Sequence, residues 1–281
     1  MQRRRTFFLI LLAMIAFAGN SLLCRLALKS TGIDPVSFTS IRIISGALVL
    51  WLITRIRGQA AWSAGSWLSA SALFVYAAGF SLAYVSLPIA TGSLLLFGAV
   101  QATMIGYGLW SGERLGAMQY LGLICAFGGL VGLLLPGLTA PPLLGSVLML
   151  GAGIAWGIYS LRSKGVSDPT AATAGNFLRA VPMVVVLSLI ALPWHSLNAA
   201  GVGYTIVSGA VASGAGYAIW YTALRGLKAT SAATNQLSVP VITAIGGILF
   251  LGELITLRLL IASAAILFGI ALVSVKKRAK P

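Results

Sequence analysis

Residues 90–113 read ATGSLLLFGAVQATMIGYGLWSGE, and their one charged residue is the last, Glu113. An uninterrupted apolar run of about 20 residues is long enough to cross the hydrocarbon core of a bilayer as a helix. Residues 230–253 read TSAATNQLSVPVITAIGGILFLGE and end on the same Gly-Glu pair. The two stretches predict transmembrane helices, and their common ending indicates an internal repeat.

The composition of the whole chain is typical of a membrane protein. Hydrophobic residues make up 59% of the 281 positions, charged residues make up 8%, and the mean hydropathy is +0.99, whereas soluble domains carry about 25% charged residues. Apolar runs recur from end to end, which leaves no room for a soluble catalytic or ATP-binding domain. The run that starts at Phe7 continues to Leu28, so we expect it to remain as the first transmembrane helix rather than to be cleaved as a signal peptide.

Charges, prolines and glycine-rich turns divide the chain into ten candidate transmembrane helices. They span residues 6–28, 36–54, 68–86, 90–111, 117–135, 143–161, 171–193, 202–224, 230–251 and 257–275. Fourteen of the 19 Lys and Arg residues fall in loops on the side of the termini, and three fall on the other side. Positively charged loops mark the cytoplasmic face, so we expect both termini to be cytoplasmic, in a multi-pass protein of the bacterial inner (plasma) membrane.

Two dipeptide signatures occur once in each half of the chain: Asp34-Pro35 and Gly112-Glu113 in the first half, Asp168-Pro169 and Gly252-Glu253 in the second. Asp-Pro combines a helix N-cap acceptor with a proline at the first helical position. Each half holds five helices, an odd number, so the second half must enter the membrane from the opposite side. The sequence therefore predicts an inverted repeat of residues 1–138 and 139–281.

These signatures, in a chain of ten helices, resemble the drug/metabolite transporter superfamily of the EamA type. The resemblance covers essentially the whole chain and is greatest to bacterial amino-acid exporters, including those for aromatic amino acids. It implies an exporter with a central cavity lined by the first, third, fourth, sixth, eighth and ninth helices. The cavity is expected at the interface of the two halves.

Polar and aromatic residues within the spans are candidates for binding the solute, because an unpaired polar group in hydrocarbon is costly. The candidates are Asn20, Tyr76, Phe80, Tyr84, Phe97, Gln101, Trp156, Tyr159, Tyr217, Trp220 and Asn235, the last beside Gln236. Aromatic residues also serve in packing and in interfacial belts, and Asn20 is equally suited to bonding a neighbouring helix. A cavity of rings, amides and hydroxyls suits amino acids, and it also suits planar organic cations, which ring faces attract.

The acidic residues bear on how transport is driven. All four of them, Asp34, Glu113, Asp168 and Glu253, fall at the ends of predicted helices. Proton-coupled export of cations commonly uses a titratable acid inside the pathway. We therefore expect facilitated export by alternating access, with a proton-coupled multidrug or organic-cation exporter as the alternative.

Two basic residues, Arg42 and Arg179, lie within spans, each near the start of its helix. We expect them to bond backbone carbonyls or to extend toward the headgroups. Attraction of a carboxylate or phosphate is the second interpretation, and it keeps a phosphate-bearing metabolite among the alternatives.

Glycine and proline indicate where helices approach and bend. Gly128 with Gly132, and Gly153 with Gly157, have the GxxxG spacing that allows close helix packing. Pro240 falls inside the ninth predicted span, where a proline frees a backbone carbonyl, so it is our candidate hinge.

The sequence offers no residue set for catalysis. It contains no paired carboxylates, no HExxH motif and no Ser-His-Asp arrangement, so we expect no enzyme, cofactor or metal. A channel would need a continuous polar pore lining, which these mostly apolar spans lack. The expected partners are a small-molecule solute and membrane lipid, and not nucleic acid.

Overall fold

The computed structural model describes residues 2–112, 114–135, 137, 140–163, 166–224 and 235–274, and every regular element among them is a helix. The long helices are α1 (Gln2–Ser30), α2 (Pro35–Ile56), α3 (Trp67–Tyr84), α4 (Ile89–Trp110), α5 (Ala117–Leu134), α6 (Leu143–Arg162), α7 (Pro169–Ile190), α11 (Ser238–Leu251) and α12 (Leu257–Ser274). Between α7 and α11, α8 (Ala199–Val207), the π-helix η3 (Ser208–Ala215) and α9 (Gly216–Leu224) follow one another without a break. Two short 3-10 helices, η1 (Ala61–Ser63) and η2 (Leu192–Trp194), lie in loops.

Eight of the described helices are long and apolar enough to cross a membrane, counting Ala199–Ala223 as one, and two shorter apolar helices follow. The predicted bounds differ from the observed ones by a few residues: 36–54 was expected where α2 runs from Pro35 to Ile56. The prediction of an all-helical integral membrane protein is confirmed at this level.

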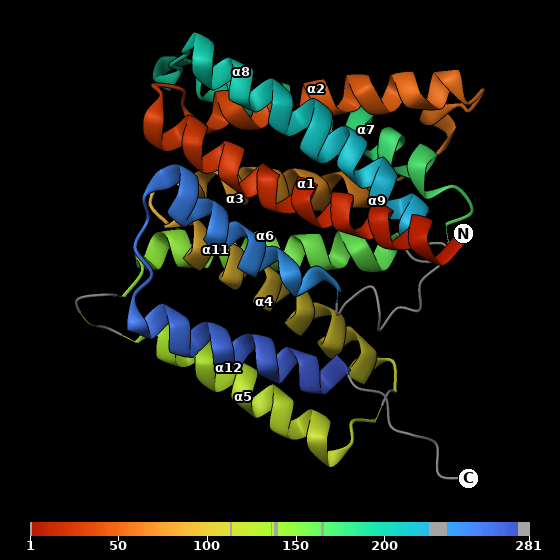
Figure 1. Ribbon diagram of the computed structural model, residues 1–281. Coiled ribbons are helices and arrows are strands. Elements are labelled where there is room, and N and C mark those ends of the chain that lie inside the picture. Colours follow the sequence, from red (N-terminus) through yellow and green to blue (C-terminus); the bar gives the residue numbers. More distant parts are fainter. Residues whose placement is uncertain are drawn as a thin grey trace.

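The helices lie side by side in a bundle (Figure 1). The start of α1 and the end of α12 lie at the same end of that bundle, and α5 packs with α12 along one edge. Burial separates central from peripheral helices: 67% of the α4 span is buried inside the protein, against 17% of the α5 span. The centre of the bundle is therefore where a site shielded from lipid can form.

The repeated dipeptides have the local roles that their chemistry predicts. Asp34 and Asp168 are the N-caps of α2 and α7, and each carboxylate accepts hydrogen bonds from two backbone N–H groups of the first turn. Gly112 and Gly252 have φ values of 90° and 60°, in the left-handed region that favours glycine. Glycine in the Gly-Glu pair thus ends a helix.

Close packing through glycine occurs at only one of the two predicted motifs. A Cβ at Gly153 or Gly157 would clash with α4, at Ala99 (2.6 Å) and Thr103 (2.8 Å) respectively. A Cβ at Gly128 or Gly132 would meet no atom of the described residues within 4 Å, so the prediction of close packing there is wrong for this part of the chain. Gly129, one residue further along, faces α12 instead, because the face of α5 that packs is rotated by one position.

Pro240 lies nearer to a helix start than the sequence suggested. It is the third residue of α11, which begins at Ser238 after a turn at Leu237, while Asn235 and Gln236 before that turn are helical. The helix is interrupted at Leu237, three residues before Pro240, although Leu237 itself has a right-handed helical backbone (φ −65°, ψ −18°), and the role of Pro240 as a hinge stays a prediction.

Candidate functional site

A small cavity lies among α1, α3, α4, α6 and α9, about halfway along the bundle. It is lined by Phe17, Asn20, Ser21, Tyr76, Phe80, Leu96, Phe97, Trp156 and Tyr217. Its volume of ≈ 20 Å³ is about what one water molecule needs. The helices are therefore closed around this point, and a metabolite can occupy it only after they move apart.

Trp156 is the ring on which the aromatic part of this site is built. Its centroid lies 4.8 Å from that of Tyr76 and 5.0 Å from that of Tyr217. Tyr159 stacks on it at 5.4 Å with an interplanar angle of 25°, and Phe17 meets it edge-on. One indole thus joins rings from α1, α3 and α9 to α6, in the offset and edge-on arrangements that aromatic pairs favour.

Asn20 is the amide of the cavity and links three helices. Its Nδ2 donates to the hydroxyl of Tyr76 (3.5 Å), and its Oδ1 accepts a hydrogen bond from the hydroxyl of Ser208 (2.6 Å). Both interpretations offered by the sequence therefore apply, because the side chain bonds neighbouring helices and also lines the cavity.

Arg42 lies deep in the protein, directly behind two of the lining rings. Only 1% of the residue is exposed. Its Nε donates to Ser213 (3.1 Å) and its Nη2 to the hydroxyl of Tyr76 (3.1 Å), while its Cζ lies 5.2 Å from the centroid of Tyr76 and 5.0 Å from that of Phe80. The expectation that this arginine bonds carbonyls or extends to the headgroups is wrong, because α2 packs against η3 and turns the side chain inward.

Arg179 does behave as expected. Its Nη1 donates to the backbone carbonyls of Ala64 (2.6 Å) and Gly175 (3.0 Å), and its Nη2 donates to that of Trp62 (2.8 Å). These bonds hold α7 to the loop before α3, away from the cavity.

The structure brings together six of the eleven candidates from the sequence. Asn20, Tyr76, Phe80, Phe97, Trp156 and Tyr217 line the cavity. Tyr159 and Trp220 lie one layer back, against Trp156 and Phe17 respectively. Their roles in binding stay predictions.

Three candidates lie apart from the lining. The ring of Tyr84 packs edge-on against Phe80, and its hydroxyl donates to the carbonyl of Ile89 (3.4 Å). Gln101 is buried one turn beyond Phe97 on α4, and Asn235 is half-buried near the start of α11.

Four residues at or behind the cavity were not chosen from the sequence as binding residues: Phe17, Ser21, Leu96 and Arg42. Phe17 carried a usable signal, because it precedes Asn20 by three residues and so shares a helix face with it. Arg42 was noticed, but its depth depends on how helices from the two halves pack.

An ion pair joins α1 to the loop that follows α11 in the described part of the chain. Arg25 Nε lies 3.2 Å from Glu253 Oε1, and its Nη1 donates to the carbonyls of Tyr84 (2.7 Å) and Val85 (3.1 Å). Glu253 Oε2 also accepts from the backbone N–H of Ile89 at the start of α4 (2.7 Å). This Arg25–Glu253 latch ties α1 to α3, α4 and the end of α11.

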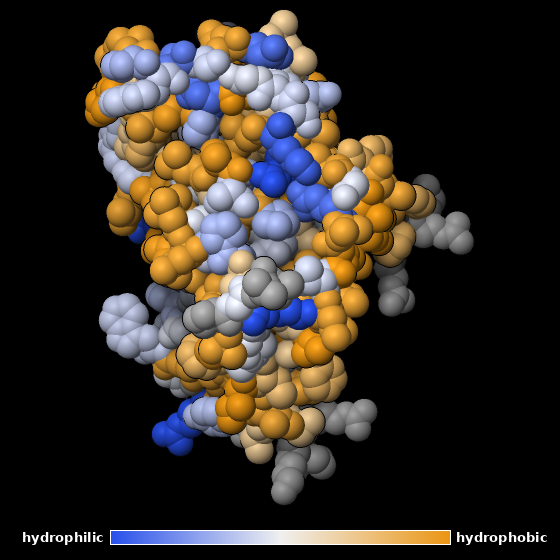
Figure 2. Space-filling model, turned by 90° about the vertical axis from the view of Figure 1, so that its left-hand side faces the viewer, coloured by the Kyte–Doolittle hydropathy of each residue, from blue (hydrophilic) through white to orange (hydrophobic). Residues whose placement is uncertain are grey.

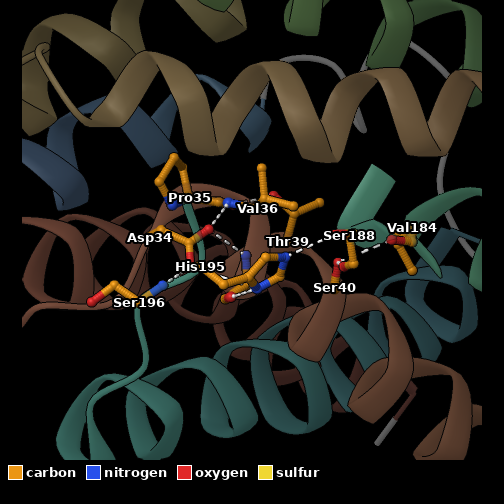
Figure 3. A network of polar contacts seen from close by, with 10 residues as sticks. Asp34, Pro35, Val36, Thr39, Ser40, Val184, Ser188, His195 and Ser196 are labelled. Atoms are coloured by element: carbon orange, nitrogen blue, oxygen red, sulfur yellow. Dashed lines mark hydrogen bonds and ion pairs between the residues drawn. The ribbon is translucent and has the colours of Figure 1, made fainter. Parts of the chain in front are cut away.

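A polar network ties α2 to the segment before α8 at the same end of the bundle (Figure 3). Asp34 Oδ2 accepts from the backbone N–H of Ser196 (2.9 Å). His195 Nδ1 lies 2.7 Å from Ser37 Oγ, and its Nε2 lies 2.9 Å from the carbonyl oxygen of Ser188. A carbonyl only accepts, so Nε2 donates and, in the neutral ring, Nδ1 accepts from Ser37.

The Asp34 carboxylate should make the free energy of unfolding fall as the pH is lowered in the acid range. Burial raises the pKa of Asp34, but hydrogen bonds from Ser37, Ser196 and Val36 outweigh it and hold the pKa below its ordinary value. Its contribution is then complete above about pH 4, the ordinary value for aspartate, and is lost as the pH falls through the lowered pKa. We expect Asp34→Asn to cost about 1 kcal/mol at pH 7, because an amide still caps the helix but can no longer accept from Ser196 with its second oxygen, and to flatten the acid-side decline, measured by thermal unfolding in detergent.

Asn198, which caps α8 with an amide, provides the control for that prediction. Asn198→Ala should lower stability by a similar amount at every pH, because no proton is involved. An acid-side decline as steep in Asp34→Asn as in the unaltered protein would contradict the assignment to Asp34.

The surface at this end of the bundle is mixed in character. Figure 2 shows hydrophilic residues in the middle of this face, at its upper edge and at its lower left, with hydrophobic residues between and beside them. Apolar side chains that point outward from the helices suit a lipid surround.

Helices of spanning length, an apolar surround and a closed polar-aromatic cavity together define a multi-pass membrane protein built like a transporter.

Comparisons with known proteins agree with this class. Residues 143–275 match the model of the EamA-like transporter family. The "Uncharacterized protein PA1977" of Pseudomonas aeruginosa is 55% identical to this chain over 97% of its length and 96% of its own. An "Uncharacterized transporter" of Archaeoglobus fulgidus is 26% identical (89% of this chain, 90% of its own), and the "Uncharacterized transporter YvbV" of Bacillus subtilis is 23% identical (99% and 94%).

A solved crystal structure of a protein 16% identical superposes with a TM-score of 0.67 over 95% of each chain. The chain belongs to the EamA-like transporter family. It is a membrane transporter of small molecules and not an enzyme.

Proposed function

We propose that this protein exports amino acids, including aromatic ones, across a bacterial inner membrane by facilitated alternating access. The observation that carries the proposal is the central cavity, where the rings around Trp156 surround the amide of Asn20 and the hydroxyl of Tyr76. Sites for small molecules are mostly apolar with a few placed polar groups. An amino acid with an apolar side chain matches such a lining, and the small volume of the cavity means that the helices must move apart before such a solute can enter.

Contacts between helices support an inverted repeat of residues 1–138 and 139–281. Exchanging the halves maps α1 onto α6, α2 onto α7, α3 onto α9, α4 onto α11 and α5 onto α12. The contact of α3 with α6 then corresponds to the contact of α9 with α1, and both pairs are packed. In the same way, the contact of α4 with α6 corresponds to the contact of α11 with α1. The pairs α2–α7 and α5–α12 each join one helix to its equivalent in the other half. Exchanging the halves maps this set of contacts onto itself, which is the arrangement expected when two repeats rock against each other around a central site.

The charge distribution supports cytoplasmic termini. The start of α1 and the end of α12 lie at one end of the bundle (Figure 1), and the topology predicted from the sequence assigns fourteen of the 19 Lys and Arg residues to that side. The positive-inside rule assigns that end to the cytoplasm.

The described carboxylates support facilitated rather than proton-coupled transport. Asp34 and Asp168 cap helices, and Glu253 is held by Arg25 and the N–H of Ile89. Glu113 lies outside the described residues.

We expect Glu113→Gln to transport at neutral pH at a rate within about twofold of the unaltered protein, because facilitated transport needs no proton carrier. Initial rates in proteoliposomes, with insertion checked by protease accessibility, would test this. Complete loss of flux from a properly inserted variant would favour the proton-coupled alternative.

The function itself is tested by uptake of labelled aromatic, aliphatic and charged amino acids and of an organic cation into proteoliposomes, with and without a pH gradient. Saturable amino-acid flux that ignores the gradient is the expected result. Flux of the cation alone, driven by protons, would overturn the proposal.

A further inference from the structure

Arg42 presents a charge for which the described part of the protein supplies no carboxylate. The three described acidic residues are engaged elsewhere: Asp34 and Asp168 at helix N-termini, Glu253 with Arg25. A guanidinium stays charged at any pH a protein meets, and a buried charge without a partner is costly. Ionisable groups inside membrane spans generally mark the path of a solute.

The guanidinium also has a nitrogen left over. Nε and Nη2 donate to Ser213 and Tyr76, but Nη1 is buried and has no hydrogen-bond partner among the described residues. Leaving a buried donor unsatisfied costs about 1–3 kcal/mol, and more for a charged group. A bound ligand that accepts a hydrogen bond from Nη1 would remove this cost.

Two donors already converge where an anion would fit. The hydroxyl oxygen of Tyr76 accepts from Arg42 Nη2 (3.1 Å) and from Asn20 Nδ2 (3.5 Å). A carboxylate in that place would accept from the same two groups and from Nη1 as well. Hydrogen bonds between ions are roughly twice as strong as neutral ones, and a guanidinium fits a carboxylate with two parallel bonds.

We propose that Arg42 binds the carboxylate of the transported solute, with Tyr76 turning aside to admit it. This rests on the proposed function and narrows it to solutes with a free carboxylate. The rings of Trp156 and Tyr217 then lie where the apolar side chain and the ammonium group of an amino acid can meet aromatic faces. Cations without a carboxylate would leave the charge of Arg42 unpaired and are disfavoured.

The experiment compares competitors of labelled phenylalanine counterflow in proteoliposomes. Phenylalanine, phenylalaninamide, phenethylamine and inorganic phosphate are tested against the unaltered protein, Arg42→Gln and Arg42→Lys. In the unaltered protein, phenylalanine should compete at least about tenfold better than its amide or amine, a difference of about 1.4 kcal/mol. In Arg42→Gln that preference should fall to within about twofold, and Arg42→Lys should keep part of it.

Arg179→Gln is the matched control, since Arg179 is the other arginine that we expected inside a span, and its bonds to the described residues all go to backbone carbonyls. It should keep the preference for phenylalanine. Because Arg42→Gln also loses packing, each purified variant is melted with and without phenylalanine; phenylalanine should raise the midpoint of the unaltered protein and of Arg179→Gln, but not that of Arg42→Gln.

The outcomes separate the two proposals. No amino-acid flux in the unaltered protein would remove the proposed function. Amino-acid flux with equal competition by the amide, or a preference that survives in Arg42→Gln, would overturn the role of Arg42 and leave the function standing. Competition by inorganic phosphate that depends on Arg42 would replace the carboxylate by a phosphate-bearing solute.

Discussion

Replacing Trp156 by alanine should lower amino-acid flux at least about tenfold, the effect of losing about 1.4 kcal/mol of solute binding. The indole is buried and contacts Tyr76, Tyr159 and Tyr217, so its removal opens a hole and frees three rings from their common support. The measurement is the initial rate of labelled phenylalanine counterflow in proteoliposomes, per molecule of inserted protein.

Controls separate loss of the site from loss of folding. Trp156→Phe keeps a ring and should retain a substantial part of the flux, and Trp194→Ala, at a residue 73% exposed, should be silent. Tyr76→Ala removes a lining ring from another helix and should also reduce flux. Unchanged flux in both Trp156→Ala and Tyr76→Ala, with normal insertion, would remove the aromatic-cavity model.

Replacing Gly209 by alanine should destabilise the protein by about 1–3 kcal/mol, the usual cost of overpacking. Gly209 lies in η3 against α2, and a Cβ there would collide with the side chain of Ser45 and the backbone carbonyl of Arg42. The expected result is a lower unfolding temperature in detergent and less protein inserted in the membrane.

Gly203, in α8 of the same continuous helix, provides the comparison. A Cβ at Gly203 would meet nothing within 4 Å in the described part of the chain, so Gly203→Ala removes a glycine without a steric clash there and should be neutral or slightly stabilising. Equal stability of Gly203→Ala and Gly209→Ala would show that η3 and α2 are not packed as closely as described.

The parts of the fold that depend on local chemistry were predictable. A helix crossing hydrocarbon must be apolar for about 20 residues, and the predicted bounds of α6, 143–161, lie within one residue of those observed. Asp34 and Asp168 were identified as caps because a carboxylate before a proline has one obvious partner, the free N–H groups of the first turn.

Features that depend on how distant helices meet were not predictable. The depth of Arg42 follows from α2 packing against η3, and which glycine of α5 faces α12 follows from the rotation of a helix about its axis. The π-helix has no signature in its sequence SGAVASGA. The lining of the cavity was predicted in part, since aromatic and amide residues in spans are few, but Phe17 and Leu96 look like any apolar residue of a span.

The π-helix η3 sets the rotation of α9 relative to α8, and with it which side chains of this continuous helix face α2 and which face the cavity. Ser213 within it bonds Arg42, and Tyr217, one turn beyond, lines the cavity. In an α-helix each residue advances by about 100° around the axis, whereas a π segment holds more residues in each turn. A single residue gained or lost in Ser208–Ala215 would therefore turn α9 relative to α8 by roughly that angle and carry Tyr217 out of the cavity, so the length of this segment is constrained as well as the identity of its packed residues.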